Sequence, residues 1–577
     1  MSLHDRVAGD PWWRNAVVYQ VYPRSFADSD GDGAGDLRGI IQRLDHLDDL
    51  GIDVLWLSPI YPSPQDDNGY DISDYRGVDP VFGDLETLDE LIADVHRRGM
   101  RIVLDLVVNH TSDEHPWFEE SRSGLDSPKR DWYWWRPPRL GDRGGEPGAE
   151  PTNWEGFFSG STWEFDEASG EYFLHLFSRK QPDLNWEHPA VRSAVYDVMR
   201  WWLDRGIDGF RMDVINLISK DPALPDGPVA PGRSLGDGSA AYLGRERVHS
   251  LLREMHREVF TDRTEHILTI GEMPGVRIDQ AADHTDPASN ELDMVFQFEH
   301  VGADHGPGGK WDLGSGGLRE AIDVLCRWQD GLADRGWNSL YWNNHDQPRV
   351  VSRFGDPERW RDSATALATV LHLQRGTPFV YQGEEIGMTN TPFASVDELR
   401  DIESLRFLDD AAGLSAAEAL GRVHRMGRDN ARTPMQWDAS PGAGFSSGTP
   451  WIGVTPDRAG ISVAEQRTDP TSVLAHYRRL IALRHDEPLV TDGRFRRITT
   501  DAPDLLVFTR EGEHDAALLV IANLSSEHIE VGESLATAEG DWELVLSNLD
   551  PGDWMTRLRP WEAVVARRVV AGDDGTT

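Results

Sequence analysis

The chain has 577 residues, of which 39% are hydrophobic and 27% charged, and it carries a formal net charge of −42 with a pI near 4.7. This length exceeds that of one ordinary domain and predicts roughly two to four domains with a sizeable buried core. Nothing in the composition indicates disorder. The negative charge argues against nucleic acid and anionic membrane surfaces as partners, whereas it does not exclude a neutral ligand.

Cysteine usage and the N-terminal sequence indicate the compartment. Cys326 is the only cysteine, so an intrachain disulfide and a Cys-based zinc site are both impossible, and we expect this side chain to be buried. The N-terminal residues MSLHDRVAGDPWW lack the charged and apolar regions of a signal peptide, and no run of about 18 apolar residues marks a membrane span. We therefore predict a cytoplasmic protein without a membrane partner, either a monomer or a weak homo-oligomer.

Short apolar runs that resemble strands alternate with segments of helical periodicity along most of the chain. The predicted strands cover residues 17–22, 54–58, 102–108, 209–215, 267–272, 294–298, 339–342 and 378–382. Helical periodicity is clearest over residues 40–50, 85–98, 191–203, 248–260, 318–332 and 361–374. Eight alternations are the number that closes a parallel (β/α)8 TIM barrel. A doubly wound open sheet gives a similar pattern, but the count and the polar residues at the strand ends favour the barrel.

The alternation of strands and helices is interrupted once and then ends, which suggests further domains. We predict that residues 1–110 and 182–490 form the barrel and that the Trp-, Gly- and Pro-rich residues 111–181 form a subdomain inserted after the third strand. Beyond that point, residues 491–577 contain short β-rich runs typical of an antiparallel β domain. A long loop is also expected over residues 220–243.

Polar residues stand at the ends of four predicted strands, where barrel active sites form. These residues are His110 after the third strand, Arg211 and Asp213 in the fourth, Glu272 at the end of the fifth, and His345 and Asp346 after the seventh. Because all carboxyl ends of parallel strands meet at one mouth, we expect the six side chains to converge. A charge-paired structural network at the barrel rim is the simpler alternative.

Such a cluster suits the cleavage of a glycosidic bond, which needs one carboxylate to attack the anomeric carbon and a second, protonated carboxyl to assist the leaving group. Asp213 and Glu272 lie on adjacent predicted strands, which would permit the separation of about 5–5.5 Å found in retaining enzymes. Arg211 should keep Asp213 ionised, while Asp346 should raise the pKa of an acidic neighbour and stabilise a cationic transition state. A two-metal site is the competing chemistry, but there is no H-x-H at the first strand and no HExxH.

A separate acidic segment predicts a structural cation site. Oxygen ligands recur at alternate positions around a glycine turn, as in the first part of a Ca²⁺ loop, although the twelfth position of an EF-hand is here a glycine. We expect structural Ca²⁺, or Mg²⁺, with a metal-free turn as the alternative, and no organic cofactor. The predicted ligands are Asp28, Asp30, Asp32, Ala34 and Asp36.

The strand-end segments also resemble a known family. DLVVNH, GFRMDV, TIGEMPG and NNHDQPR are similar to the four signature regions of the α-amylase superfamily, and QPDLNW resembles a further signature of its oligo-1,6-glucosidase branch. The similarity extends over nearly the whole chain. It implies that Asp213 is the nucleophile, Glu272 the acid/base and Asp346 the transition-state stabiliser. It also implies that His110, Arg211 and His345 bind glucose in the first subsite, so the expected partner is a small oligosaccharide.

The resemblance implies additional substrate contacts in the segment DDNGYD. Asp67 would bind the distal hydroxyls of the terminal glucose, and Tyr70 would stack on its ring. Asp67 would pair with Arg428 or Arg432 of GRDNAR, with Arg428 slightly favoured. Such a pair would close the pocket beyond the first sugar and make the enzyme exo-acting.

The same resemblance suggests a linkage preference. In this branch, valine directly after the nucleophile is typical of α-1,6-acting enzymes, and here the residue is Val214, while Phe158 and Phe177 would supply apolar walls. We therefore predict a retaining α-glucosidase that prefers isomaltose-type substrates. An α-1,4-preferring glucosidase or a sucrose-acting glucosyltransferase is the alternative. Transfer to other acceptors stays open, and a non-catalytic barrel subunit is disfavoured because all three carboxylates are present.

Overall fold

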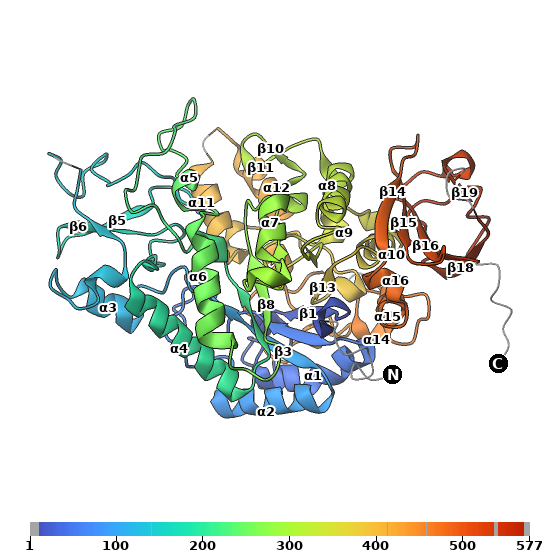
Figure 1. Ribbon diagram of the computed structural model, residues 1–577, viewed down its shortest axis with the longest axis horizontal. Coiled ribbons are helices and arrows are strands. Elements are labelled where there is room, and N and C mark those ends of the chain that lie inside the picture. Colours follow the sequence, from blue (N-terminus) through green and yellow to red (C-terminus); the bar gives the residue numbers. More distant parts are fainter. Residues whose placement is uncertain (1–10, 140, 412, 457–458, 536–539, 570–577) are drawn as a thin grey trace.

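The computed structural model describes residues 11–139, 141–411, 413–456, 459–535 and 540–569. The first ten residues, which bear on the signal-peptide prediction, and the last residues of the predicted C-terminal domain lie outside the described part. A barrel occupies the centre, the insertion lies at one side (cyan in Figure 1) and a β domain lies at the opposite side (red). The predicted architecture of a parallel barrel with a C-terminal antiparallel sheet is therefore confirmed.

Eight parallel strands form the barrel, in the order β12-β13-β1-β2-β3-β7-β8-β9. A parallel bridge between Val295 and Asn338 joins the two outer strands and closes the ring. The strands are β1 (Val18–Val21), β2 (Val54–Leu57), β3 (Arg101–Leu106), β7 (Gly209–Met212), β8 (Leu268–Glu272), β9 (Met294–Phe296), β12 (Ser339–Leu340) and β13 (Thr377–Tyr381).

The third strand is shorter than its apolar run predicts. Val107 and Val108 are buried, yet they lie outside the sheet. Their carbonyl groups accept hydrogen bonds from the side chains of Tyr75 and Trp186 instead of from a neighbouring strand. The apolar run thus continues as a buried loop whose backbone is satisfied by side chains.

Helices cover the outside of the barrel, and local capping fixes their ends. Asp36 begins α1 by accepting a hydrogen bond from the Gly39 amide at 2.6 Å, and Gly51 ends it in the left-handed conformation at φ 89°. The surrounding helices are α1 (Leu37–Leu50), α2 (Leu85–Arg97), α4 (Pro189–Arg205), α6 (Arg247–Met255), α7 (Ile278–His284), α8 (Gly317–Gly331), α10 (Trp360–His372) and α15 (Val473–Asp486). The helix predicted over 248–260 changes to a π-helix at His256–Phe260. Cys326 is buried in α8, as expected.

The insertion after β3 contributes Trp134, Trp154 and Trp163 to a separate small core. Its three-stranded antiparallel sheet has the order β4-β6-β5. The chain returns to the barrel through residues that pair back onto the exit of β3, since Asp183 bridges His110 and Leu184 bridges Tyr133. The elements are α3 (Pro116–Arg122), β4 (Trp135–Arg136), β5 (Trp163–Asp166) and β6 (Glu171–Leu174).

The C-terminal domain is built on a five-stranded antiparallel sheet with the order β14-β15-β16-β20-β18. Two more strands in the described part of this domain, β17 and β19, form a separate pair. The elements are β14 (Arg494–Ile498), β15 (Leu505–Glu511), β16 (Ala517–Asn523), β17 (Ile529–Glu530), β18 (Trp542–Ser547), β19 (Arg557–Leu558) and β20 (Ala563–Arg568).

Shorter elements lie in the segments that follow the barrel strands. A hairpin after β9 packs on the helices after β13, where the rings of Trp311 and Phe407 stack at 4.4 Å. These elements are α5 (Ser239–Tyr242), β10 (His305–Gly306), β11 (Gly309–Leu313), α9 (Val350–Arg353), α11 (Ile402–Asp410), α12 (Ala416–Met426), α13 (Asp429–Arg432), α14 (Val463–Gln466) and α16 (Pro488–Thr491).

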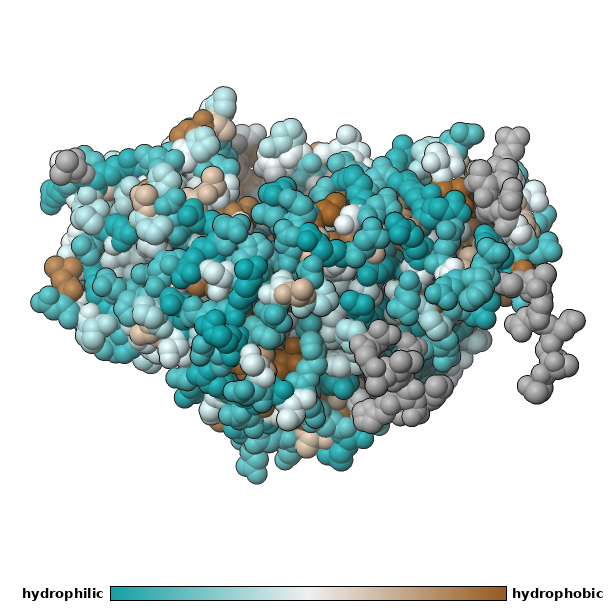
Figure 2. Space-filling model, viewed as in Figure 1, coloured by the Kyte–Doolittle hydropathy of each residue, from teal (hydrophilic) through white to brown (hydrophobic). Residues whose placement is uncertain are grey.

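The visible surface is mainly hydrophilic, with apolar residues scattered singly or in small groups (Figure 2). Within the described ranges, no helix is both long and apolar enough to cross a bilayer.

Candidate active site

A single arginine connects three carboxyl groups at the carboxyl end of the barrel. Arg211 in β7 contacts Asp105 of β3 at 2.6 Å and Asp213 at 2.7 Å through Nη1. Its Nη2 lies 2.6 Å from Oε1 of Glu272, the last residue of β8. All four residues are buried. The predicted nucleophile and acid/base are thus bound to the two terminal nitrogens of one guanidinium group, inside the same mouth.

This cluster has more carboxyl groups than cations, and the pKa values reflect the imbalance. Burial raises the pKa of Asp213 well above its usual range; Arg211 opposes this effect, and the negative charges of Glu272 and Asp105 add to it. Burial also raises the pKa of Asp105, to about 6. From the sequence we expected Arg211 to lower the pKa of Asp213 and keep it ionised, and Asp346 to raise the pKa of an acidic neighbour. Instead, burial outweighs Arg211 and raises the pKa of Asp213, and Asp105 supplies the additional negative charge.

The backbone after Asp213 is strained and points at the acid/base. Val214 has φ 36° and ψ 41°, the left-handed conformation that β-branched residues rarely adopt. In this conformation its amide donates a hydrogen bond of 3.1 Å to Oε2 of Glu272. The Asp213 amide in turn donates to the carbonyl of Leu106 at 3.0 Å. The turn after β7 therefore fixes both carboxyl groups relative to each other.

A second charged cluster holds Asp346. Its Oδ1 lies 2.9 Å from Nη2 of Arg432 and 3.3 Å from Nη1 of Arg428. Both arginines also contact the fully buried Asp401, at 3.5 Å and 2.6 Å respectively. Burial would raise the pKa of Asp346, but His345 and the two guanidinium groups hold it well below its usual range. Asp346 is therefore ionised at neutral pH.

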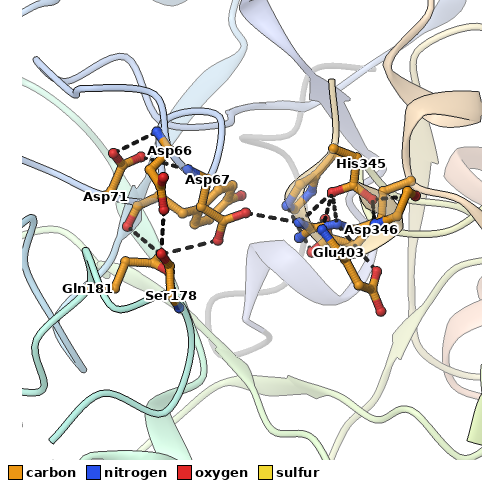
Figure 3. A network of polar contacts seen from close by, with 12 residues as sticks. Asp66, Asp67, Asp71, Ser178, Gln181, His345, Asp346 and Glu403 are labelled. Carbon is orange, nitrogen blue, oxygen red and sulfur yellow. Dashed lines mark hydrogen bonds and ion pairs between the residues drawn. The ribbon is translucent and has the colours of Figure 1, made fainter. Parts of the chain in front are cut away.

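The structure distinguishes the two arginines of GRDNAR. Arg428 contacts Asp67 at 2.9 Å, and Figure 3 shows Asp67 facing the cluster that contains His345, Asp346 and Glu403. The other oxygen of Asp67 accepts a hydrogen bond of 3.1 Å from Gln181. Burial nevertheless raises the pKa of Asp67 to about 6, although Arg428 opposes the shift. Of the two pairings left open by the sequence, the Asp67–Arg428 pair is the one observed.

The two predicted sugar-binding histidines are buried and neutral. Burial lowers the pKa of His110 to about 4 and that of His345 to about 3. The ring of Tyr70 stacks on His345 with centroids 5.0 Å apart and planes within 5°. Gln20 lies 2.8 Å from Nδ1 of His345. Neutral imidazoles can donate and accept, which suits sugar hydroxyls better than a fixed charge.

Aromatic side chains from the insertion line the same region. Arg428 lies 5.0 Å from the ring centroid of Phe158, and the ring of Phe177 lies 5.2 Å from that of His110. Phe157, which we had not predicted, stacks on Phe177 at 4.8 Å. The insertion therefore places apolar surface beside the charged clusters.

Several residues of the site were missed by sequence reasoning. Asp105 and Gln181 belong to the segments DLVVNH and QPDLNW, so these motifs could have identified them as site residues. Asp401 belongs to no segment that we had singled out, and only the fold shows that it lies between Arg428 and Arg432.

The acidic segment before α1 gathers only part of the predicted metal set. Carboxylate oxygens of Asp28, Asp30 and Asp36 lie within 4.8 Å of one another. Asp32 is not in that group, and its Oδ1 accepts a hydrogen bond from the Ala34 amide at 2.8 Å. Three converging carboxylates are oxygen donors of the kind that Ca²⁺ and Mg²⁺ take, so the segment fits the predicted cation.

Comparisons with known proteins agree with this geometry. The α-amylase catalytic-domain family model matches residues 20–493. The chain is 51% identical over 562 residues to an oligo-1,6-glucosidase of Parageobacillus thermoglucosidasius, covering 96% of this chain and 98% of that one. The trehalose-6-phosphate hydrolase of Bacillus licheniformis has a TM-score of 0.89 at 43% identity, covering 97% of this chain and 100% of that one. Isomaltulose synthase from Klebsiella sp. LX3 has a TM-score of 0.90 at 37% identity, with the same coverage.

Proposed function

The chain belongs to the α-amylase family of glycoside hydrolases, and from that premise we propose that it is a retaining, exo-acting α-glucosidase that prefers α-1,6 linkages in short oligosaccharides. The observation that carries the proposal is the attachment of Asp213 and Glu272 to one guanidinium group in a buried mouth. A retaining glycosidase needs two neighbouring carboxyl groups in different protonation states.

The reaction gives the two carboxyl groups different roles. Asp213 attacks the anomeric carbon while Glu272 gives its proton to the departing glycosidic oxygen, which leaves as a neutral hydroxyl. Glu272 then takes a proton from water, and the resulting nucleophile releases glucose from Asp213 with the original α configuration. Three carboxyl groups around Arg211 favour the retention of one proton in the cluster, and ionised Asp346 stabilises the positive charge on the sugar ring.

The exo mode rests on the ion pair between Asp67 and Arg428. Their 2.9 Å contact joins the segment after β2 to the segment before α13, and Phe158 lies beside the guanidinium group. A glucose unit that is bound by His110 and His345 would then have its far hydroxyl groups against this pair. A chain that continues past this sugar would have to break a buried ion pair, which is costly.

The proposed linkage preference rests on Val214 and on proteins to which this chain is similar. Because the Val214 amide binds Glu272, this side chain lies next to the group that protonates the leaving sugar. A branched apolar side chain there reshapes the acceptor site, an effect of about 1–3 kcal/mol. The relative that is named oligo-1,6-glucosidase shares 51% identity with this chain. An α-1,4-preferring glucosidase and a sucrose-acting glucosyltransferase are the alternatives.

A phosphorylated disaccharide, the substrate that the Bacillus licheniformis enzyme's name implies, is a poorer fit. A phosphate group would need cations that are free to bind it. Arg428, Arg432 and Lys310 near Asp346 are already paired with carboxylates, and Lys310 lies 2.5 Å from Glu403.

The test is a comparison of kcat/KM for isomaltose, maltose, trehalose, sucrose, panose and trehalose 6-phosphate, with product analysis. The proposal predicts the highest value for isomaltose or panose and glucose as the first product. A higher value for maltose or sucrose would support the alternatives, and a higher value for trehalose 6-phosphate would contradict the argument from paired cations.

We also propose that Ca²⁺, or Mg²⁺, occupies the segment of Asp28, Asp30 and Asp36 and stabilises the fold without entering the reaction. EDTA should then lower Tm while leaving kcat unchanged at a temperature where the protein is folded. An equal loss of both would place the ion in the active site. A cytoplasmic location and a monomeric or weakly associated state complete the proposal, and fractionation and size-exclusion chromatography test them.

A further inference from the structure

Two histidines and a glutamate converge at a place that has no part in the proposed reaction. His249 of α6, His284 at the end of α7 and Glu291 in the segment before β9 come from three separate elements. Nδ1 of His249 lies 2.8 Å from Oε2 of Glu291 and 3.0 Å from its Oε1, and Nδ1 of His284 lies 2.7 Å from the same Oε2. One donor atom of each residue lies within 4.8 Å of the other two.

We propose that His249, His284 and Glu291 bind a divalent transition-metal ion of the zinc type. Two imidazole nitrogens and one carboxylate oxygen are ligands that Zn²⁺ takes at about 2.0–2.2 Å in tetrahedral geometry. The donors already lie near the separation found around such an ion, so they need to move apart by only about 0.5 Å. A metal ion would replace the two N–H···O hydrogen bonds that now join the imidazoles to the carboxylate.

Neighbouring contacts hold these donors in place. Nη2 of Arg253 lies 2.8 Å from Oε1 of Glu291, which leaves Oε2 directed at the two imidazoles. The rings of His249 and His284 stack with centroids 4.1 Å apart and planes within 14°. The Glu291 side chain is fully buried, so its orientation is fixed by these partners. Outer contacts that orient a ligand in this way are typical of metal sites.

A water-sized cavity lies beside one of the three residues, and another is partly exposed. His284 lines a cavity of ≈ 100 Å³ together with Asn216 and Met273, which is large enough for water. The side chain of His249 is 17% exposed and offers a path from solvent. Because imidazole favours Zn²⁺ whereas the acidic segment at Asp28 offers only carboxylates, the two sites should select different ions.

The test titrates the untagged full-length chain with Zn²⁺ by calorimetry and with Co²⁺ by visible absorption, in excess Ca²⁺ and Mg²⁺ to fill oxygen sites. We expect one site per chain with the absorption bands of tetrahedral Co²⁺. His249→Asn should weaken binding by more than about tenfold. The matched control is His266→Asn. His266 also contacts a carboxylate, that of Asp293 at 2.9 Å, but no second histidine among the described residues contacts that carboxylate. This control should bind the ions as the parent chain does.

Equal binding by the parent chain and His249→Asn would overturn the proposal, as would Co²⁺ binding without tetrahedral bands. A second measurement needs no variant, which matters if His249→Asn fails to fold. Zn²⁺ should raise the Tm of the parent chain, release protons on binding and lose affinity as the pH falls below the range where imidazole is neutral. Binding that releases no protons and ignores pH would also overturn the proposal.

Discussion

Two clusters of carboxylates and arginines lie in the active-site mouth, and they differ in the ratio of cations to carboxylates. One arginine, Arg211, serves Asp105, Asp213 and Glu272. Around Asp346, by contrast, the two arginines of GRDNAR share the charge, and its pKa lies well below the usual range. The first cluster therefore retains a mobile proton and can do acid/base chemistry, whereas the second offers a fixed negative charge. Burial raises the pKa of carboxyl groups in both clusters, but around Asp346 the neighbouring cations outweigh it.

The largest effect should come from removing a carboxyl group of the first cluster. Asp213→Asn and Glu272→Gln should each reduce kcat for isomaltose by about 10²–10⁴-fold or more, because nucleophilic attack or proton transfer is lost. Circular dichroism and Tm should show a folded protein in both cases. Near-normal activity in either variant would remove that residue from the proposed chemistry.

The sequence predicted the first cluster better than the second. Arg211 and Asp213 are two residues apart at the end of one strand, and the neighbouring strands follow the period of a barrel, so their convergence with Glu272 was foreseeable. Asp401 reaches Arg428 and Arg432 only because of the tertiary fold of the segment after β13, and no local sequence pattern predicts that fold. The backbone of Val214 was also unpredictable, because a β-branched residue at positive φ contradicts local preference and is held by its surroundings.

A smaller effect should follow from changing the geometry of the second cluster while keeping its charge. Arg428 contacts Asp67, Asp346 and Asp401 at once, which the single ammonium group of lysine cannot do. Arg428→Lys should therefore raise KM for isomaltose by about 10–100-fold with a lesser change in kcat, and it should raise the relative rate on longer oligosaccharides. A purely structural role would lower Tm without changing the ratio of long to short substrates.

The pH dependence of KM should separate Asp67 from the first cluster. Burial raises the pKa of Asp67 to about 6, so the carboxylate that accepts sugar hydroxyls becomes protonated as the pH falls through that value. KM should therefore rise below about pH 6, and in Asp67→Asn it should be high and independent of pH. If the rise of KM persists in Asp67→Asn, another group, such as Asp105 with its pKa of about 6, is responsible.

The smallest effect concerns linkage. Val214→Thr keeps a branched side chain next to Glu272 but adds a hydroxyl group at the acceptor side. We expect the ratio of kcat/KM for isomaltose to that for maltose to fall by about tenfold. An unchanged ratio would mean that Val214 supports the backbone turn without shaping the acceptor site.

The stereochemistry of the first product tests the two-carboxylate mechanism most directly. Proton NMR spectra, recorded within seconds of mixing enzyme with isomaltose, distinguish α-glucose from β-glucose before mutarotation equalises them. A retaining reaction through Asp213 and Glu272 predicts that α-glucose appears first. The initial release of β-glucose would show that water attacks the sugar directly, and it would contradict the assignment of Asp213 as the nucleophile.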